Sequence, residues 1–152
     1  MIISLMISIF CTTVISFISF FIYRFSKEKA NQYGILRRQN QILQRWLRKE
    51  SYHHGFFKSK LAIKGYKRVL IYGAGAIGMQ IYYALDGSEI EVVGFIDRSV
   101  KRVGVPVPVY QIHEEFPKVD AIIISVLKDQ KQMIDNLNMY IDGEIILIDQ
   151  IV

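Results

Sequence analysis

The sequence predicts an α/β domain with a doubly wound parallel sheet of about five strands, preceded by a transmembrane helix and a basic amphipathic helix. Two observations predict the sheet. Apolar runs of strand length alternate with helical segments, and a glycine-rich turn joins the first strand to the first helix. An uncharged run at the start of the chain, followed by a basic amphipathic stretch, predicts the two preceding helices. With 152 residues, the chain has room for one ordinary domain and an appendage.

The first segment, residues 1–23, reads MIISLMISIFCTTVISFISFFIY and contains no charged side chain. A helix of about 20 such residues spans a hydrocarbon core of about 30 Å, so the segment predicts an uncleaved, single-pass membrane anchor. A cleavable signal peptide is the competing interpretation, but no basic residue precedes the run and no small-x-small cleavage pattern follows it. Because Arg24, Lys27 and Lys29 follow immediately, the positive-inside rule predicts an inner (cytoplasmic) membrane protein whose C-terminal domain is cytoplasmic.

The second segment, residues 24–64, is predicted as a basic amphipathic helix and linker. Its apolar residues recur at spacings of three, four and seven: Ile35, Leu36, Ile42, Leu43, Trp46 and Leu47. Three interpretations stay open: the helix continues the membrane helix and pairs with a partner, lies on anionic lipid headgroups, or packs on its own domain or a second copy. Gly55 ends the pattern. The adjacent His53 and His54 are assigned to the linker, because neighbouring positions are poorly spaced for metal ligands on one helical face.

Charge is distributed unevenly along the chain. Residues 1–65 hold eleven Lys/Arg and two acids, a balance of +9, whereas the remainder holds eight basic and twelve acidic residues, a balance of −4. An acidic domain without aromatic residues among basic ones is a poor candidate for gripping phosphate backbones, so nucleic-acid binding is set aside.

The third segment, residues 65–152, is predicted as a nucleotide-binding domain of alternating strands and helices. Strands are expected at 68–72, 91–97, 120–126 and 144–149, with an extended segment at 104–110 whose prolines exclude a helix interior. Helices are expected at 76–85 and 128–140, with a short helical turn in QIHEEF at 111–116. Apolar strands separated by helices indicate a parallel sheet covered on both faces. The right-handed crossover rule leaves a doubly wound sheet as the simplest topology.

The chemistry of the domain is predicted at its first strand-to-helix turn. Gly73, Gly75 and Gly78 form a complete G-x-G-x-x-G, in which the first permits the tight turn, the second leaves room for a pyrophosphate and the third allows close helix packing. Asp97 follows 19 residues after Gly78 (97 − 78), where an acid can accept hydrogen bonds from a ribose. The arrangement is Rossmann-like. The predicted nucleotide-binding residues are Gly73, Ala74, Gly75, Ala76, Ile77, Gly78, Asp97 and Arg98, the last of which could serve a 2′-phosphate or face water.

The stretches VLIYGAGAIGMQIYYAL, EIEVVGFIDRS, GVPVPVY and VDAIIISV resemble the nucleotide-binding domain of bacterial surface-glycan enzymes. The pattern is similar to that ahead of the catalytic domain in membrane-bound nucleoside-diphosphate-sugar epimerase/dehydratases of capsule synthesis. It is also similar to the N-terminal domain of sialic-acid O-acyltransferases and sugar N-acetyltransferases. This resemblance implies a site for NAD or NADP, or alternatively for a nucleotide-sugar or coenzyme A. It also implies that Ser125, after the strand IIIS, lies near that site, whereas the residues alone favour a strand-end serine bonded to backbone.

No catalytic constellation or metal-ligand cluster is predicted. A Tyr-x-x-x-Lys at Tyr23 to Lys27 precedes the glycine loop at the membrane boundary and is assigned to chance, and His113 is assigned to the surface. With no second domain following, a self-sufficient enzyme is not expected. The sequence favours a membrane-anchored accessory or regulatory module that binds a nucleotide, with membrane lipid and either a second copy or a glycan-synthesis enzyme as partners. A subunit of a split sugar-nucleotide enzyme, a regulatory subunit of an ion transporter and a purely oligomerising domain stay open.

Overall fold

The computed structural model describes residues 2–99 and 104–152, without the side chains of residues 2, 4, 5, 7 and 8. The chain divides into two compact units, Met1–Arg37 and Arg38–Val152. Helix α1 (Ile2–Tyr52) begins in the first unit and ends in the second. The predicted amphipathic helix is therefore a continuation of the apolar one, without a break between them.

The first unit consists of the N-terminal part of α1. The large apolar side chains that the structure describes up to residue 25 are exposed, among them Phe10, Phe17 and Phe21, and the uncharged stretch is long and apolar enough to cross a membrane. A signal sequence near the N-terminus would have the same length and composition. The hydroxyls of Thr12 and Thr13 donate to the carbonyls of Ile9 and Phe10, at 2.9 and 2.8 Å, so these polar groups are satisfied within the helix.

The second unit is built on a five-stranded parallel sheet with the order β3-β2-β1-β4-β5. Its strands are β1 (Arg68–Tyr72), β2 (Glu91–Ile96), β3 (Val109–Tyr110), β4 (Ala121–Ile124) and β5 (Glu144–Leu147). All four strand pairs are parallel, and the register shifts once, between Val69 and Leu70 on β1. Strands β1 and β4 are apolar and buried along most or all of their length, as strands covered on both faces require.

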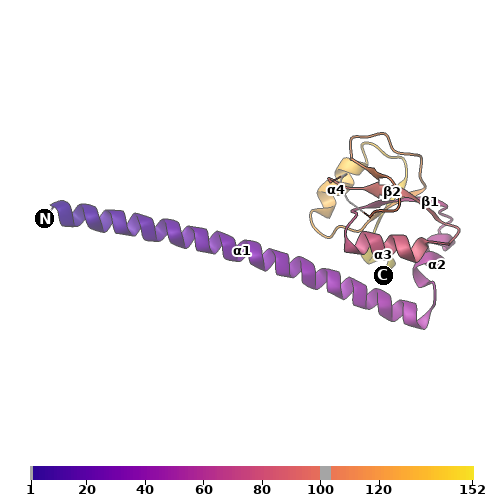
Figure 1. Cartoon of the computed structure of the whole chain (residues 1–152), viewed down its shortest axis with the longest axis horizontal. Helices are drawn as coiled ribbons and strands as arrows, with labels where there is room; N and C mark the ends of the chain where they lie inside the picture. Colours follow the sequence, from indigo (N-terminus) through magenta and orange to yellow (C-terminus); the bar gives the residue numbers. More distant parts are fainter. Residues whose placement is uncertain (1, 100–103) are drawn as a thin grey trace. The chain divides into compact units, whose positions relative to one another are not determined.

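Helices cover both faces of the sheet. Helix α3 (Ala76–Leu85) connects β1 to β2 and packs on one face, and α4 (Gln130–Leu137) connects β4 to β5 and packs on the other (Figure 1). The two crossovers leave the centre of the sheet in opposite directions, so equal handedness requires them to lie on opposite faces. The face that carries α3 is also covered by α2 (Phe56–Ile63), by α5 (Ile148–Ile151) and by the last turns of α1.

Two helices were not predicted from the sequence. Helix α2 lies in the predicted linker: Gly55, at φ 73°, reverses the chain, and the Glu50 carboxylate accepts hydrogen bonds from the N–H groups of Gly55 and Phe57. Helix α5 replaces the end of the predicted strand 144–149, which was wrong for Ile148 and Asp149. Gln150 Oε1 accepts from the Leu147 N–H at 3.1 Å, where the chain leaves the sheet.

Other predicted elements are shorter in the structure. The helical turn predicted in QIHEEF is a single hydrogen-bonded turn, in which the Glu114 N–H donates to the Gln111 carbonyl at 3.0 Å, and no helix follows. The extended segment 104–110 contributes only two residues to the sheet, because Pro106 and Pro108 have no N–H to donate to a ladder. The prediction for the 120–126 strand was also too long, since β4 ends at Ile124.

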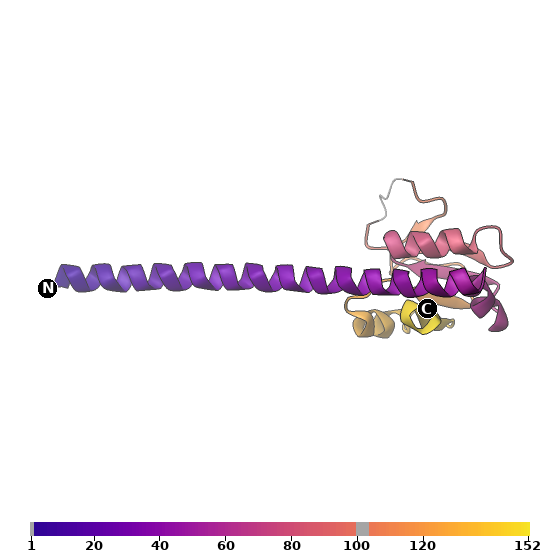
Figure 2. The same cartoon turned by 90° about the horizontal axis from the view of Figure 1, so that it is seen from below.

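The last turns of α1 belong to the hydrophobic core of the second unit. Ile42 is fully buried, and Trp46 stacks on Phe57 of α2 with 4.4 Å between the ring centroids. Arg38 Nη2 lies 2.5 Å from Asp149 Oδ2, which ties α1 to α5, and these two helices pass next to each other in Figure 2. Packing on its own domain, one of the three interpretations left open by the sequence, is thus confirmed for this part of the helix. The compact unit begins upstream of residue 65.

The edge of the sheet at the amino ends of the strands is fastened by two carboxylates. Asp120 Oδ2 accepts from the N–H groups of Lys67 and Arg68 at 2.7 and 2.8 Å, and these hydrogen bonds lower the pKa of Asp120. Glu144 accepts a hydrogen bond from the Tyr66 hydroxyl. Burial of the phenol, together with this bond, raises the pKa of Tyr66 to about 12.

We expect Trp46→Ala to lower the free energy of unfolding of the second unit by about 3–5 kcal/mol, since a large buried aromatic side chain is lost and a cavity remains. Gln44→Ala, at an exposed position two residues earlier, is the matched control and should change it by less than about 0.5 kcal/mol. Urea unfolding of the Arg38–Val152 fragment, followed by circular dichroism, gives both values. Equal and small effects would contradict the assignment of α1 to the core.

The raised pKa of Tyr66 predicts a loss of stability at high pH. Tyr66 ionises less readily in the folded protein, so its contribution is complete below the unfolded value of 10.0 and is lost as the pH rises towards about 12. We expect the stability advantage of the wild-type protein over Tyr66→Phe to shrink across that interval, as measured by urea unfolding at a series of pH values. Lysine deprotonation affects both proteins alike, and a constant difference would contradict the prediction.

Candidate functional site

The glycine-rich loop has the geometry that its sequence predicts. Gly73 has φ +97°, and a Cβ there would lie 2.6 Å from Val126 Cγ2. At Gly78, a Cβ would lie 1.9 Å from the carbonyl oxygen of Gly73. The predicted roles of Gly73 in the turn and of Gly78 in close packing are confirmed, because only a residue without a side chain fits at either position.

Gly75 is the open member of the three glycines. It has φ −83° at the N-cap of α3, and no atom lies within 4 Å of the position a Cβ would take. The N–H groups of Gly75, Ala76, Ile77 and Gly78 donate to no residue that the structure describes, whereas the next N–H, of Met79, donates to the Gly75 carbonyl at 2.9 Å. The start of α3 therefore presents several amide donors and the positive end of its dipole at the carboxyl edge of the sheet.

Asp97 fastens the loop to the end of β2. Its Oδ2 accepts from the Ala74 N–H at 2.8 Å and its Oδ1 accepts from the Ser99 N–H at 3.0 Å, while the Gly73 N–H donates to the Ile96 carbonyl at 2.7 Å. The Ala74 amide thus already donates to a carboxylate, whose negative charge opposes a phosphate at that point. A phosphate is favoured further along, at the first turn of α3, and a hydroxyl donor is favoured beside Asp97.

Ser125 lies directly beneath the loop. Its side chain is buried, and its Oγ is 2.8 Å from the carbonyl oxygen of Tyr72 and 3.0 Å from that of Gly73. Oγ would also be 2.8 Å from a Cβ at Gly73 and 3.2 Å from one at Gly78. The alternative in which this serine bonds to backbone is confirmed. Its proximity to the glycine loop, implied by the resemblance, is also found. The hydroxyl lies against the backbone of the loop and helps to fix its conformation.

A hollow of about 150 Å³ lies beside the loop, at the carboxyl ends of β1, β2 and β3. Its lining residues are Tyr72, Ile96, Asp97, Arg98, Gln111, Ile112 and His113. Arg98 is exposed at the rim. Burial raises the pKa of Tyr72, and the positive charge of Arg98 opposes that rise. The structure thus brings the predicted Asp97 into contact with the loop and places the predicted Arg98 in the hollow with Asp97 and Tyr72.

The sequence analysis did not identify Gln111 and His113 as part of this hollow. His113 is exposed, as predicted, and it lies on the turn that follows β3. Position alone could have indicated both residues, because side chains just after a strand gather at the carboxyl edge of a parallel sheet.

Gly94 explains part of the GFID stretch. A Cβ at this position would lie 2.6 Å from Tyr110 Cε2 and 2.7 Å from the Pro108 carbonyl oxygen. Because Gly94 has no side chain, the short strand β3 can approach β2, and the Phe95 and Asp97 N–H groups donate to the carbonyls of Pro108 and Tyr110. The pairing of β3 with β2 therefore places residues 111–113, which follow β3, in the lining of the hollow.

Two other hollows of the second unit lie away from the glycine loop. One of about 590 Å³ adjoins the segments that enter β4 and β5, including Phe116–Val119 and Tyr140–Gly143, at the amino edge of the sheet. One of about 370 Å³ lies among α1, α2 and α3. Among the described residues no group of three or more His, Cys, Asp and Glu could hold a metal ion. No protein-family model, curated protein or solved structure matches the chain.

The geometry of the two glycines predicts very different effects of Gly78→Ala and Gly75→Ala on the free energy of unfolding. Gly78→Ala forces a Cβ against the Gly73 carbonyl, so we expect a loss of several kcal/mol, about 3 or more, in the free energy of unfolding. Gly75→Ala has free space and an ordinary φ, and we expect a change within about 0.5 kcal/mol. Urea unfolding of the two variants tests this, and a Gly78→Ala protein as stable as the wild type would contradict the loop geometry.

Proposed function

We propose that the second unit is a doubly wound, Rossmann-like domain that binds a nucleotide or nucleotide-sugar at the glycine loop. The strand order, β3-β2-β1-β4-β5, supports this, since it reverses at β1. In such sheets, ligands bind outside the carboxyl ends of the strands at the point of reversal. The loop Gly73–Gly78 leaves the sheet at that point, directly after β1.

The observation that carries the proposal is the cluster of amide donors at the start of α3. None of the N–H groups of residues 75–78 donates to an acceptor among the residues that the structure describes. The space beside them is open because Gly75 has no side chain. Such a cluster, on the positive end of a helix dipole, suits a diphosphate. The residues therefore fit the phosphates of NAD, NADP, coenzyme A or a nucleotide-sugar, with the base left unselected by backbone amides.

The Asp97 carboxylate is suited to accept a hydrogen bond from a sugar hydroxyl next to the proposed phosphate position. Both of its oxygens already accept from backbone N–H groups, but a carboxylate oxygen has two lone pairs and can accept again from a hydroxyl. A phosphate ester on that hydroxyl would meet the carboxylate charge. Arg98, exposed beside it, is the group that could compensate such a charge.

The apolar part of α1 supports membrane attachment. We propose that it is an uncleaved anchor that holds the nucleotide-binding domain at the cytoplasmic face of the inner membrane, with the adjacent basic residues against anionic lipid. On the resemblance to surface-glycan enzymes, the protein would serve bacterial surface-polysaccharide synthesis as an accessory or regulatory module. A role as one subunit of a split sugar-nucleotide enzyme uses the same site and differs in the partner.

Ligand-dependent thermal unfolding tests the site. The Arg38–Val152 fragment would be melted with NAD, NADP, coenzyme A, UDP and UDP-sugars in turn. A ligand at about 100 times its Kd should add about 2.7 kcal/mol to the free energy of unfolding. Gly75→Val is the matched control, because its side chain enters the space proposed for the diphosphate and its Cβ has no heavy atom of the described protein within 4 Å.

We expect at least one ligand to raise the melting temperature of the wild-type fragment and to leave that of Gly75→Val unchanged. A shift of equal size in both proteins would place the ligand elsewhere. Identical melting with every ligand, from a fragment that unfolds cooperatively, would contradict nucleotide binding at this loop.

A further inference from the structure

An outward-facing stripe on α1 has a spacing that its contacts within the chain do not explain. In the second unit the stripe comprises Asn40, Leu43 and Leu47, separated by three and four residues, and Leu47 is 69% exposed. The same alternation continues along the sequence of the helix, in the first unit, at Leu36 and Tyr33, which are 59% and 69% exposed. Residues that alternate at three and four form the a and d positions of a coiled coil, here with Tyr33, Asn40 and Leu47 at a and Leu36 and Leu43 at d, and with Glu50 at the next d position.

The stripe is separate from the face of α1 that packs on the domain. Ile42 and Trp46 face the core, whereas Leu43 is half-buried and Leu47 lies outside. The positions that flank an a/d stripe, e and g, are occupied by Gln32, Arg37, Gln39, Gln44, Trp46 and Ser51. Arg37 is the one charged residue among them.

The other basic residues of this helix region lie off the stripe. Arg38 is paired with Asp149, and Arg45, Arg48 and Lys49 occupy the f, b and c positions. A strongly basic helix would normally repel a second copy of itself. Within residues 33–51, every basic residue except Arg37 is kept away from the a, d, e and g positions, and Glu50, at the last d position, accepts hydrogen bonds from the start of α2, so the stripe is suited to a like partner.

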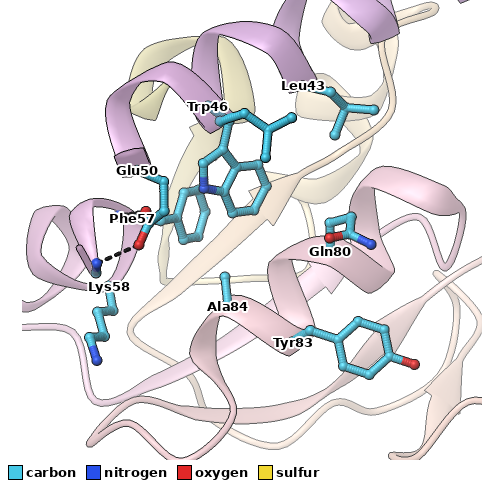
Figure 3. A pocket seen from close by; sticks show the side chains of 10 residues that line it. Leu43, Trp46, Glu50, Phe57, Lys58, Gln80, Tyr83 and Ala84 are labelled. Atoms are coloured by element: carbon cyan, nitrogen blue, oxygen red, sulfur yellow. Dashed lines mark hydrogen bonds between the residues drawn. The ribbon is translucent and has the colours of Figure 1, made fainter. Parts of the chain in front are cut away.

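The stripe forms one wall of the 370 Å³ groove. Leu43 and Glu50 of α1 line one side, Gln80, Tyr83 and Ala84 of α3 line the other, and Trp46 lies between them (Figure 3). Leu47 also belongs to the lining. Glu50 is engaged by the N–H groups at the start of α2. Tyr83 is 58% exposed at the rim, so a helix that lies along the stripe would also cover part of α3.

We propose that this stripe pairs with the same stripe of a second copy in a parallel two-stranded coil, with Asn40 opposite Asn40 of that copy. The single Asn at an a position favours two parallel strands in one register, because a shifted or antiparallel arrangement places its amide opposite a leucine. About two heptads are too short to be stable alone, so the groove of α3 supplies further contact area. The inference does not depend on the nucleotide site.

Disulfide crosslinking of the full-length chain tests the pairing. With Cys11 replaced by serine, Asn40→Cys would be compared with Gln41→Cys, an exposed amide one residue away, in membranes and in detergent. Helix axes about 10 Å apart, less two Cα radii of about 2.3 Å, leave roughly 5 Å between facing a positions, a separation that a disulfide spans. We expect mild oxidation to convert Asn40→Cys to a covalent dimer and to leave Gln41→Cys monomeric.

A second substitution separates specific pairing from random collision. Adding Leu47→Asp to Asn40→Cys should slow crosslinking by about tenfold or more, since a carboxylate would then replace, on both chains, a leucine that the proposed pairing buries. Arg48→Asp, a position off the stripe, should not slow it. Equal crosslinking at positions 40 and 41, no dimer at position 40, or crosslinking of Asn40→Cys to a different protein instead of itself would each overturn the proposal.

Discussion

The approach of α3 to the end of β1 is the constraint on which the rest of the site depends. The carbonyl oxygen of Gly73 occupies the space where a side chain at Gly78 would begin. The hydroxyl oxygen of Ser125 would also lie only 2.8 Å from a Cβ at position 73 and 3.2 Å from a Cβ at position 78. Because the helix starts this close to the strand, its first N–H groups open onto the carboxyl edge of the sheet. Asp97 and the short strand β3 are then drawn to the same edge by hydrogen bonds to the loop and to β2.

Local patterns were enough to predict the centre of the fold. Strand β1 and helix α3 have the predicted ends, because an apolar run, three glycines and a helical apolar rhythm are all contiguous in the sequence. The elements that were missed depend on distant partners. Helix α2 is short, and its burial comes from Phe57 and Leu61 meeting α1 and the sheet, while α5 is held by the ion pair between Asp149 and Arg38.

The candidate site divides in the same way. The glycines and Asp97 could be found by spacing, since the turn and the end of the second strand lie at fixed distances in such units. Spacing does not predict the hydrogen bond from the Ala74 N–H to Asp97. It also does not predict that Ser125 lies within hydrogen-bonding distance of two carbonyl oxygens. The contacts of Ser125 depend on the register that pairs Tyr72 with Ile124, because this register places Ser125 just beyond the end of β1. The sequence of one strand alone does not determine its register with a distant strand.

Helix α3 joins the two surfaces that we assign to binding. Its first residues form the proposed anion-binding end at the glycine loop, and its later residues, Gln80, Tyr83 and Ala84, line the groove beside α1. The helix is only 10 residues, about 15 Å, long, and Ile77, Ile81 and Leu85 fix its inner face in the core. In a close-packed interior such a helix moves as one body or not at all. A ligand that shifted the start of α3 would therefore also shift the residues that line the groove, so the two proposed sites would be coupled through this helix.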